Sequence, residues 1–219
     1  MEFKALAGNA GEWLKGTGPE SDVVISTRVR LARNLADFPF LTRATAPQRK
    51  ELEDILRKEI KASGALQKDL YYPLDGAAPL DLQFLVERHL ISRDLAASEG
   101  ARGVAFGERE AVSLMVNEED HLRMQVLKSG LQIQAAAEQI GKIDDLLEKR
   151  LDFAFSPTLG YLTVCPTNVG TGLRVSVMMH LPALVISKQI EKVFYAVSKI
   201  NLAVRGLYGE GTQASGNFF

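Results

Sequence analysis

Two short apolar runs separated by three charged residues constrain the fold of this chain more than any other feature. Gly103-Val-Ala-Phe-Gly107 and Ala111-Val-Ser-Leu-Met-Val116 flank Glu108-Arg-Glu110, a pattern that predicts two antiparallel strands in a hairpin. Elsewhere, strand and helix patterns alternate irregularly, which favours a mixed or antiparallel sheet over a doubly wound parallel one. We therefore predict an α+β fold, with a mostly antiparallel sheet flanked by helices.

Further patterns predict the elements around that hairpin. Residues 23–35 alternate so that Arg28 and Arg30 lie on one face of a strand, although this stretch alone favours an exposed edge strand with solvated arginines. Thr45 and Gln48 resemble a capping box, which predicts a helix over 46–62 that ends at Gly64. Apolar spacing predicts further helices at 82–90, 131–151 and 187–200, and further strands at 161–165, 173–180 and from 202 into a glycine-rich turn.

The chain divides into two parts by composition. Residues 1–20 are rich in glycine and predict an irregular lead-in, whereas residues 21–219 carry the periodic patterns of one domain. The sequence stops in the apolar segment Gly216-Asn-Phe-Phe219 without a terminating signal. We therefore expect the natural protein to continue beyond this point.

Charge and cysteine content exclude several classes of function. With 26 basic and 27 acidic residues the net charge is -1, so the overall balance does not suggest a nucleic-acid or membrane-surface binder. One cysteine rules out an internal disulfide framework, and one cysteine with three histidines makes a structural zinc site unconvincing. The first residues lack a signal-peptide pattern and no apolar run reaches membrane-spanning length, so we predict a cytoplasmic protein.

Charged residues suited to phosphoryl transfer gather near the predicted strand ends. Arginines can hold the phosphates of a nucleotide, because their planar fork is always charged. Glutamates can hold a cationic acceptor and draw a proton from its attacking nitrogen, and a thiolate can add a further negative group. The residues of these three kinds are Arg28, Arg30, Arg123, Arg174, Arg205, then Glu119 and Glu210, then Cys165.

Simpler interpretations exist for several of these residues. The acidic stretch at 117–120 also fits an ordinary solvated turn, His89 a structural histidine, and a single cysteine a buried spectator. His121 is expected to orient its loop. Gly170 and Gly172 do not form a G-x-G-x-x-G pattern and no Walker A lysine motif is present, so a dinucleotide-binding or P-loop site is not indicated.

Four ordered motifs resemble the catalytic domain of the phosphagen (guanidino) kinases, whose fold is glutamine-synthetase-like. They are Ser26-Thr-Arg-Val-Arg30, Asn117-Glu-Glu-Asp-His-Leu-Arg123, Cys165-Pro-Thr-Asn-Val-Gly-Thr-Gly-Leu-Arg174 and Arg205-Gly-Leu-Tyr-Gly-Glu210. The resemblance implies that residues 21–219 are this catalytic domain, that the five arginines clamp the phosphates of ATP, and that Glu119 and Glu210 grip the acceptor guanidinium beside Cys165. It also places His89 against the adenine.

The resemblance implies Mg²⁺ as the ion that accompanies ATP. The ion would be held mainly through the nucleotide phosphates and water rather than by a protein metal site. Glu118 and Asp120 are candidates for contacts to the waters of that ion.

Departures from the small-molecule members of the family favour a protein substrate. Only residues 1–22 precede Val23, where those enzymes carry a helical domain, and Gly211 follows Glu210 where they usually have histidine. The chain is similar in these respects to the bacterial branch that phosphorylates arginine side chains of proteins. We predict an ATP-dependent protein arginine kinase that works by direct in-line transfer, in stress response and marking for proteolysis. The alternatives are a small-molecule guanidino kinase and a catalytically silent arginine- or phosphoarginine-binding adaptor.

The same resemblance indicates the partners. They are proteins with exposed arginines as substrates, an activator protein, AAA+ protease machinery and a second copy in a homodimer. No nucleic acid or membrane partner is expected.

Overall fold

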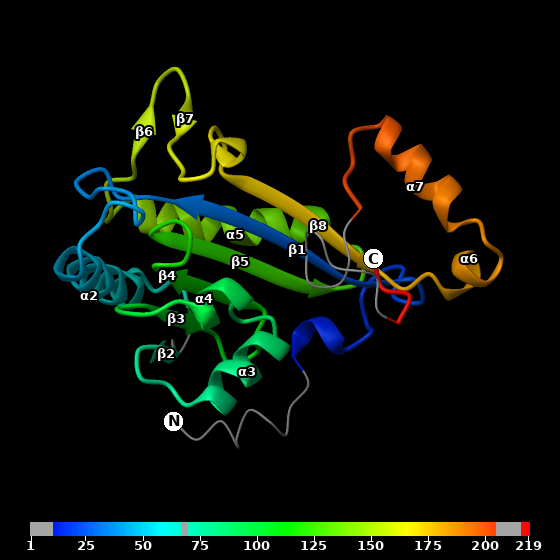
Figure 1. Ribbon diagram of the computed structural model, residues 1–219, viewed down its shortest axis with the longest axis horizontal. Coiled ribbons are helices and arrows are strands. Elements are labelled where there is room, and N and C mark those ends of the chain that lie inside the picture. Colours follow the sequence, from blue (N-terminus) through cyan, green and yellow to red (C-terminus); the bar gives the residue numbers. More distant parts are fainter. Residues whose placement is uncertain (1–10, 67–69, 205–215) are drawn as a thin grey trace.

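The computed structural model describes residues 11–66, 70–204 and 216–219, and its centre is a six-stranded sheet flanked by helices (Figure 1). Every paired strand in this sheet runs antiparallel to its neighbour, which confirms the predicted fold class. In spatial order the strands are β2 (Leu70–Pro73), β3 (Gly103–Phe106), β4 (Val112–Val116), β5 (Leu122–Ser129), β1 (Val24–Arg33) and β8 (Leu173–Met179). A separate small hairpin pairs β6 (Phe155–Ser156) with β7 (Gly160–Tyr161).

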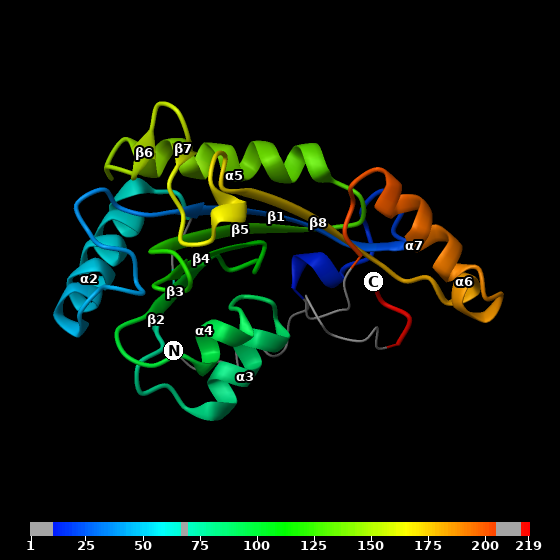
Figure 2. The same cartoon turned by 45° about the horizontal axis from the view of Figure 1, so that its top comes forward.

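Helices lie on both faces of the sheet (Figure 2). On one face are α2 (Ala46–Ser63) and α5 (Ile133–Glu148), and on the other are α3 (Pro79–Glu87) and the short α4 (Arg93–Ala97). Beyond the end of β8, α6 (Pro182–Ile186) and α7 (Ile190–Lys199) extend away from the sheet. Two single 3-10 turns are η1 (Glu12–Leu14) and η2 (Pro166–Asn168). None of the helices in the described ranges combines the length and the apolar character that crossing a membrane requires.

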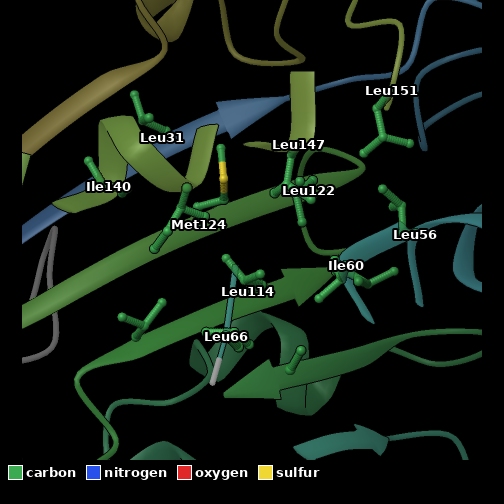
Figure 3. Packing of buried hydrophobic residues seen from close by; sticks show 14 of the residues in the cluster. Leu31, Leu56, Ile60, Leu66, Leu114, Leu122, Met124, Ile140, Leu147 and Leu151 are labelled. Atoms are coloured by element: carbon green, nitrogen blue, oxygen red, sulfur yellow. The ribbon is translucent and has the colours of Figure 1, made fainter. Parts of the chain in front are cut away.

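The main core lies between the sheet and the helices α2 and α5 (Figure 3). Leu31, Leu114 and Met124 project from three strands of the sheet, and Leu56 and Ile140 face them from the two helices. The apolar residues of α5 repeat at helical spacing, so the helix buries one continuous stripe. Burial of such side chains is the dominant stabilising contribution to the fold.

The opposite face of the sheet is covered over only part of its width. A second apolar cluster, which includes Leu85 and Leu95 from α3 and α4, covers Phe106 on β3 and Met115 on β4. The same face of β1 and β8 instead carries Arg28, Arg30 and Arg174. This change from apolar to charged residues across one face leaves room for a polar cleft.

β1 has the alternation that its sequence predicts, but it is not an edge strand. It lies between β5 and β8, with Arg30 opposite Gln125 on one side and Arg174 on the other. Val29 is fully buried on the side of α5. The arginines of β1 are therefore held in the middle of the sheet and not in solvent.

Two predicted ends of α2 are confirmed in detail. Gln48 Oε1 accepts a hydrogen bond from the backbone N of Thr45 at 2.9 Å, one half of the expected capping box. Gly64 follows the helix with a φ of 65°, a conformation that glycine adopts at little cost.

Other segments differ from the prediction. β2, β5, α4 and α6 were not expected, and His89 lies two residues after the end of α3 rather than inside the helix. The predicted strand at 161–165 is wrong, because only Tyr161 belongs to a strand and the chain then bends into η2. Residues 202–204 form no strand, and the rest of that predicted element lies outside the described residues.

The described part of the glycine-rich lead-in is attached to the domain. Trp13 is buried, and its ring meets the ring of His89 edge-on at a centroid distance of 4.8 Å. The backbone N of Thr17 donates to Ser129 Oγ at 3.2 Å, at the end of β5. The lead-in therefore covers the end of the sheet where His89 lies.

Candidate active site

Three neighbouring strands bring three of the predicted arginines into one cleft. Arg30 from β1, Arg123 from β5 and Arg174 from β8 line it together with Glu119. The antiparallel register explains this meeting, because Arg30 is paired with Arg174 and its neighbour Ala32 is paired with Arg123. Paired residues share a face of the sheet, so the three guanidinium groups point to the same side.

The arginine cluster carries more positive charge than its surroundings balance. Burial lowers the pKa of Arg30 to about 8, and the neighbouring Arg28, Arg123 and Arg174 add to this effect. Arg30 Nε is a buried donor with no hydrogen-bond partner among the described residues. Within the same ranges, no carboxylate lies at ion-pair distance from Arg28 or Arg30. Such a cluster fits an anion that bears several negative charges.

A second pocket adjoins the cluster at Arg28. Arg28 lines it together with His89, Met178 and Phe219. Burial, and then the charge of Arg28, lower the pKa of His89 to about 4, so its ring is neutral near pH 7. A neutral imidazole between apolar side chains fits a flat, uncharged ring system better than it fits a second anion.

Glu118 belongs to the arginine cluster as a fixed counter-ion. Its Oε1 accepts from Arg123 Nη1 at 2.5 Å and from Ser92 Oγ at 2.6 Å, and its Oε2 accepts from the backbone N of Glu119 at 2.8 Å. Burial raises the pKa of Glu118, but Arg123 and these hydrogen bonds outweigh it and hold the pKa below its ordinary value. Both oxygens of Glu118 are thus occupied by the protein.

Glu119 differs from its neighbours on both sides because its side chain is exposed. It receives no hydrogen bond from any residue in the described ranges. Partial burial raises its pKa, and the adjacent Asp120 and Glu118 raise it further. A carboxylate with a raised pKa that faces a cleft is suited to accept a proton from a bound molecule.

The rest of this loop is buried and holds Glu119 in place. Asp120 Oδ1 accepts from Asn34 Nδ2 at 2.6 Å and from the backbone N of Val164 at 2.8 Å. His121 Nδ1 accepts from the backbone N of Leu35 at 3.0 Å, which leaves the proton on Nε2 to be donated to the carbonyl of Pro39. The expected role of His121 in orienting the loop is confirmed.

This arrangement does not favour the ion contacts considered for Glu118 and Asp120. Both oxygens of Glu118 and one of Asp120 are used within the protein, and Asp120 is only 2% exposed. No group of three or more possible metal ligands is present in the described ranges. Glu118 and Asp120 are thus held by hydrogen bonds within the protein.

Cys165 lies next to this loop but not among the residues that line the cleft. Its thiol is half-buried and lies 3.0 Å from Thr167 Oγ1. The preceding residue, Val164, is bonded to Asp120, and Asn168, three residues later, lines the cleft with Glu119. The structure thus places the cysteine segment beside the acidic loop.

The glycine turn before Arg174 is shaped by a buried arginine that the sequence did not single out. Arg33 binds Asp144 through two hydrogen bonds, of 3.1 Å and 2.5 Å, and donates to the carbonyl of Thr171 at 2.9 Å. Gly172 has a φ of 63°, and a Cβ there would lie 2.6 Å from the carbonyl oxygen of Ala32. Glycine is therefore required where this turn passes closely over the end of β1.

Most of the residues in or beside the two pockets were predicted from the sequence, but the buried residues that hold them in place were not. Arg28, Arg30, Arg123, Arg174, Glu119, His89 and Cys165 lie in or beside the two pockets. Arg205 and Glu210 lie outside the described residues. Arg33 and Asn34 were missed, and the signal available for them was their position at the end of the arginine strand.

Comparison with known proteins agrees with this geometry. Residues 51–219 match the family described as ATP:guanido phosphotransferase, C-terminal catalytic domain. A protein-arginine kinase of Symbiobacterium thermophilum is 53% identical over the whole chain, and one of Brevibacillus brevis is 50% identical over 94% of it. The chain spans 63% and 58% of the length of these two relatives.

Solved structures have the same fold. The duplicated taurocyamine kinase from Schistosoma mansoni with bound transition state analog components is 29% identical, with a TM-score of 0.82 over 92% of this chain and 29% of its own. Lombricine kinase is 26% identical, with a TM-score of 0.76 over 96% of this chain and 62% of its own.

Proposed function

Because the chain belongs to the ATP:guanido phosphotransferase family, we propose that it transfers the γ-phosphoryl group of ATP to arginine side chains of proteins. The observation that carries this proposal is a cleft lined both by three arginines and by an exposed glutamate whose side chain has no hydrogen bond to any described residue. A phosphate chain fits the arginines and a guanidinium fits the glutamate. The two reactants would thereby meet with complementary charges.

The arginine side holds the nucleotide. Arg28, Arg30, Arg123 and Arg174 donate charge-assisted hydrogen bonds to the phosphates, and Arg205 is proposed to join them from outside the described residues. The negative phosphates offset the burial and the repulsion between arginines that lower the pKa of Arg30 in the free protein. The base of the nucleotide lies in the adjoining pocket against His89, whose neutral ring can stack on it.

The acidic side holds and activates the acceptor. Glu119, with Glu210 as its proposed partner, binds the guanidinium and orients one nitrogen toward the γ-phosphorus. That nitrogen forms the N–P bond as the bond to the bridging oxygen of ADP breaks, and its proton passes to Glu119. The raised pKa of Glu119 suits this transfer. Cys165 provides a polarisable, potentially negative group beside the cation.

Mg²⁺ accompanies ATP in this proposal and neutralises part of the charge of the phosphates when it is bound. Both oxygens of Glu118 already accept hydrogen bonds within the protein, so the ion would be held mainly by the nucleotide phosphates and water. Glu118 keeps Arg123 in place instead, through the 2.5 Å hydrogen bond to its Nη1.

A protein substrate is favoured over a small guanidino compound by the relatives. Those that are 45–53% identical are protein-arginine kinases, whereas the taurocyamine and lombricine kinases are 26–29% identical. The small-molecule kinase and the silent adaptor are the alternatives that the experiment must separate.

With this function we also propose the finer features that the resemblance implies. Residues 21–219 form the catalytic unit, which works in the cytoplasm as part of a homodimer. An activator protein and AAA+ protease machinery act with it, in bacterial stress response and marking for proteolysis.

The test uses the full natural chain with magnesium ATP and either an unfolded casein or free arginine. We expect acid-labile phosphate on arginines of casein, formed at least about 100-fold more slowly with Glu119→Gln. Phosphate on free arginine alone would make the chain a small-molecule kinase. Binding of ATP without transfer to either acceptor would make it an adaptor.

A further inference from the structure

A buried pair of polar side chains joins three segments that are distant in the sequence. Asp120 Oδ1 accepts both Asn34 Nδ2 and the backbone N of Val164, at 2.6 and 2.8 Å. Asn34 Nδ2 also donates to the carbonyl of Leu162 at 3.0 Å, and Asn34 Oδ1 accepts from the backbone N of His121 at 2.9 Å. Asp120 and Asn34 are 2% and 1% exposed, so water does not compete for these bonds.

The segments that this pair joins carry the residues of the acceptor side. Glu119 directly precedes Asp120, and Cys165 directly follows Val164. Thr163 extends the link, since its Oγ1 donates to the carbonyl of Cys165 at 2.8 Å. The side chain of Glu119 has no hydrogen bond to a described residue, and the thiol of Cys165 contacts Thr167 Oγ1 from its own turn. The distance between the two side chains therefore depends on the link beneath them.

We propose that Asp120 and Asn34 are positioning residues that fix Glu119 relative to Cys165. This inference rests on the proposed function and adds one feature to it. The hydrogen bonds of Asp120 and Asn34 fix the acceptor side, which is Glu119 and the segment of Cys165. They do not fix the phosphate side, which is the cluster of arginines. Neither side chain bonds to Arg28, Arg30 or Arg123 in the described structure. The arginine side has a separate buried support, the Arg33–Asp144 pair beneath the Gly172 turn.

The single cysteine of the chain allows the link to be tested without turnover. In Asp120→Asn, we measure the rate at which iodoacetamide alkylates Cys165, and the protection of the thiol by acetyl-arginine amide. We expect the rate to change about tenfold and the protection to be lost, because a misplacement of about 1 Å at a site costs up to about 100-fold. The Kd for ATP, measured by calorimetry, should stay within about twofold of the wild-type value, since charge-assisted contacts to phosphate are unchanged.

Asp144→Asn is the matched control, because it removes one buried carboxylate from the other support. It should weaken ATP binding and leave the alkylation rate of Cys165 at the wild-type value. Thr163→Val is a milder variant of the same link and serves if Asp120→Asn does not fold; we expect a smaller change in the alkylation rate, in the same direction.

Two results would overturn the proposal. One is a wild-type alkylation rate in both Asp120→Asn and Thr163→Val. The other is a loss of ATP affinity in Asp120→Asn equal to that in Asp144→Asn, which would indicate general loosening of the domain. Neither readout needs phosphoryl transfer, so an absence of kinase activity in the wild-type chain would count against the proposed function and not against this link.

Discussion

The two sides of the cleft are built in opposite ways. On the phosphate side, arginines project from the strands β1, β5 and β8, and burial followed by their mutual repulsion lowers the pKa values of Arg28 and Arg30. On the acceptor side, Glu119 stands on a loop beside the segment of Cys165, and a buried set of hydrogen bonds centred on Asp120 joins the two segments. The strands thus carry arginines that repel one another until an anion binds. The loop carries a glutamate whose position is fixed by buried hydrogen bonds.

The difference shows how a site can contain unfavourable charge without losing its shape. A strand held on both sides cannot move a crowded arginine into solvent, so the cost persists until an anion binds. A loop has no such restraint and must be fixed by specific side chains. The phosphate side should therefore respond to mutation through stability and nucleotide affinity, and the acceptor side through turnover.

The largest expected effect separates chemistry from nucleotide binding. Glu119→Gln keeps the size of the side chain and removes its ability to accept a proton, so kcat should fall by about 100- to 10,000-fold. The Kd for ATP should remain near the wild-type value, because the arginine side is intact. Steady-state kinetics and calorimetric titration check the two halves, and unchanged turnover would contradict the role of Glu119.

Replacement of Arg30 should lower the affinity for ATP and raise the stability of the free protein. Arg30→Met should lower ATP affinity by about 100-fold, through the loss of charge-assisted hydrogen bonds worth about 3 kcal/mol. In the absence of ATP it should raise the free energy of unfolding by about 1–3 kcal/mol, because a buried charge without a counter-ion is removed. Arg43→Met, at an exposed position, is the control and should change neither quantity. A less stable Arg30→Met protein would show that the cluster is not strained.

The pH dependence of stability tests the same side through His89. Its folded pKa of about 4 lies below the ordinary value of 6.5, so the unfolded chain binds the extra proton first as the pH falls. The free energy of unfolding should drop by up to about 3 kcal/mol between about pH 6.5 and pH 4. His89→Asn should flatten this dependence, and asparagine tolerates the positive φ of 57° at this position. Chemical denaturation at a series of pH values measures it.

The smallest effects compare two glycines, one in the turn before β8 and one inside α5. Gly172→Ala should lower the free energy of unfolding by about 1–3 kcal/mol and weaken ATP binding, because its backbone is left-handed and a Cβ meets Ala32. Gly141→Ala lies inside α5 with open space around it, and should raise stability by about 0.5–1 kcal/mol without changing activity. Thermal unfolding and ATP titration distinguish them. Equal effects at both positions would remove the special role of the Gly172 turn.

Strand β1, which carries the arginines, was predictable from the sequence, whereas its neighbour β5 was not. From Arg28 to Leu31, β1 alternates between arginine and apolar residues, so this part of its sequence indicates which side is buried. β5 is buried on both faces over Met124, Gln125, Val126 and Leu127, so this alternation is absent. The acidic residues just before β5 also favoured an ordinary solvated turn over the start of a strand.

The supports of the acceptor side could not be predicted from local sequence. The run from Tyr161 to Cys165 has the composition of a strand, but the backbone N of Val164 donates to a side chain 44 residues earlier instead of to a neighbouring strand. Asn34 and Asp120 are 86 residues apart, and neither stands in a periodic pattern that would pair them. Motif resemblance located the groups that are proposed to contact the reactants, and only the tertiary structure revealed what holds them in place.

The register of β1 determines both which side chains face the cleft and which pack in the core. Because successive side chains alternate, inserting or deleting one residue between Ser26 and Arg30 would turn the arginines toward α5 and the valine and leucine toward the cleft. Binding and core packing would fail together, and no substitution nearby could restore one of them alone. Changes in length among related sequences should therefore be confined to loops, and a chain with a register-shifted β1 should misfold rather than fold with a defective cleft.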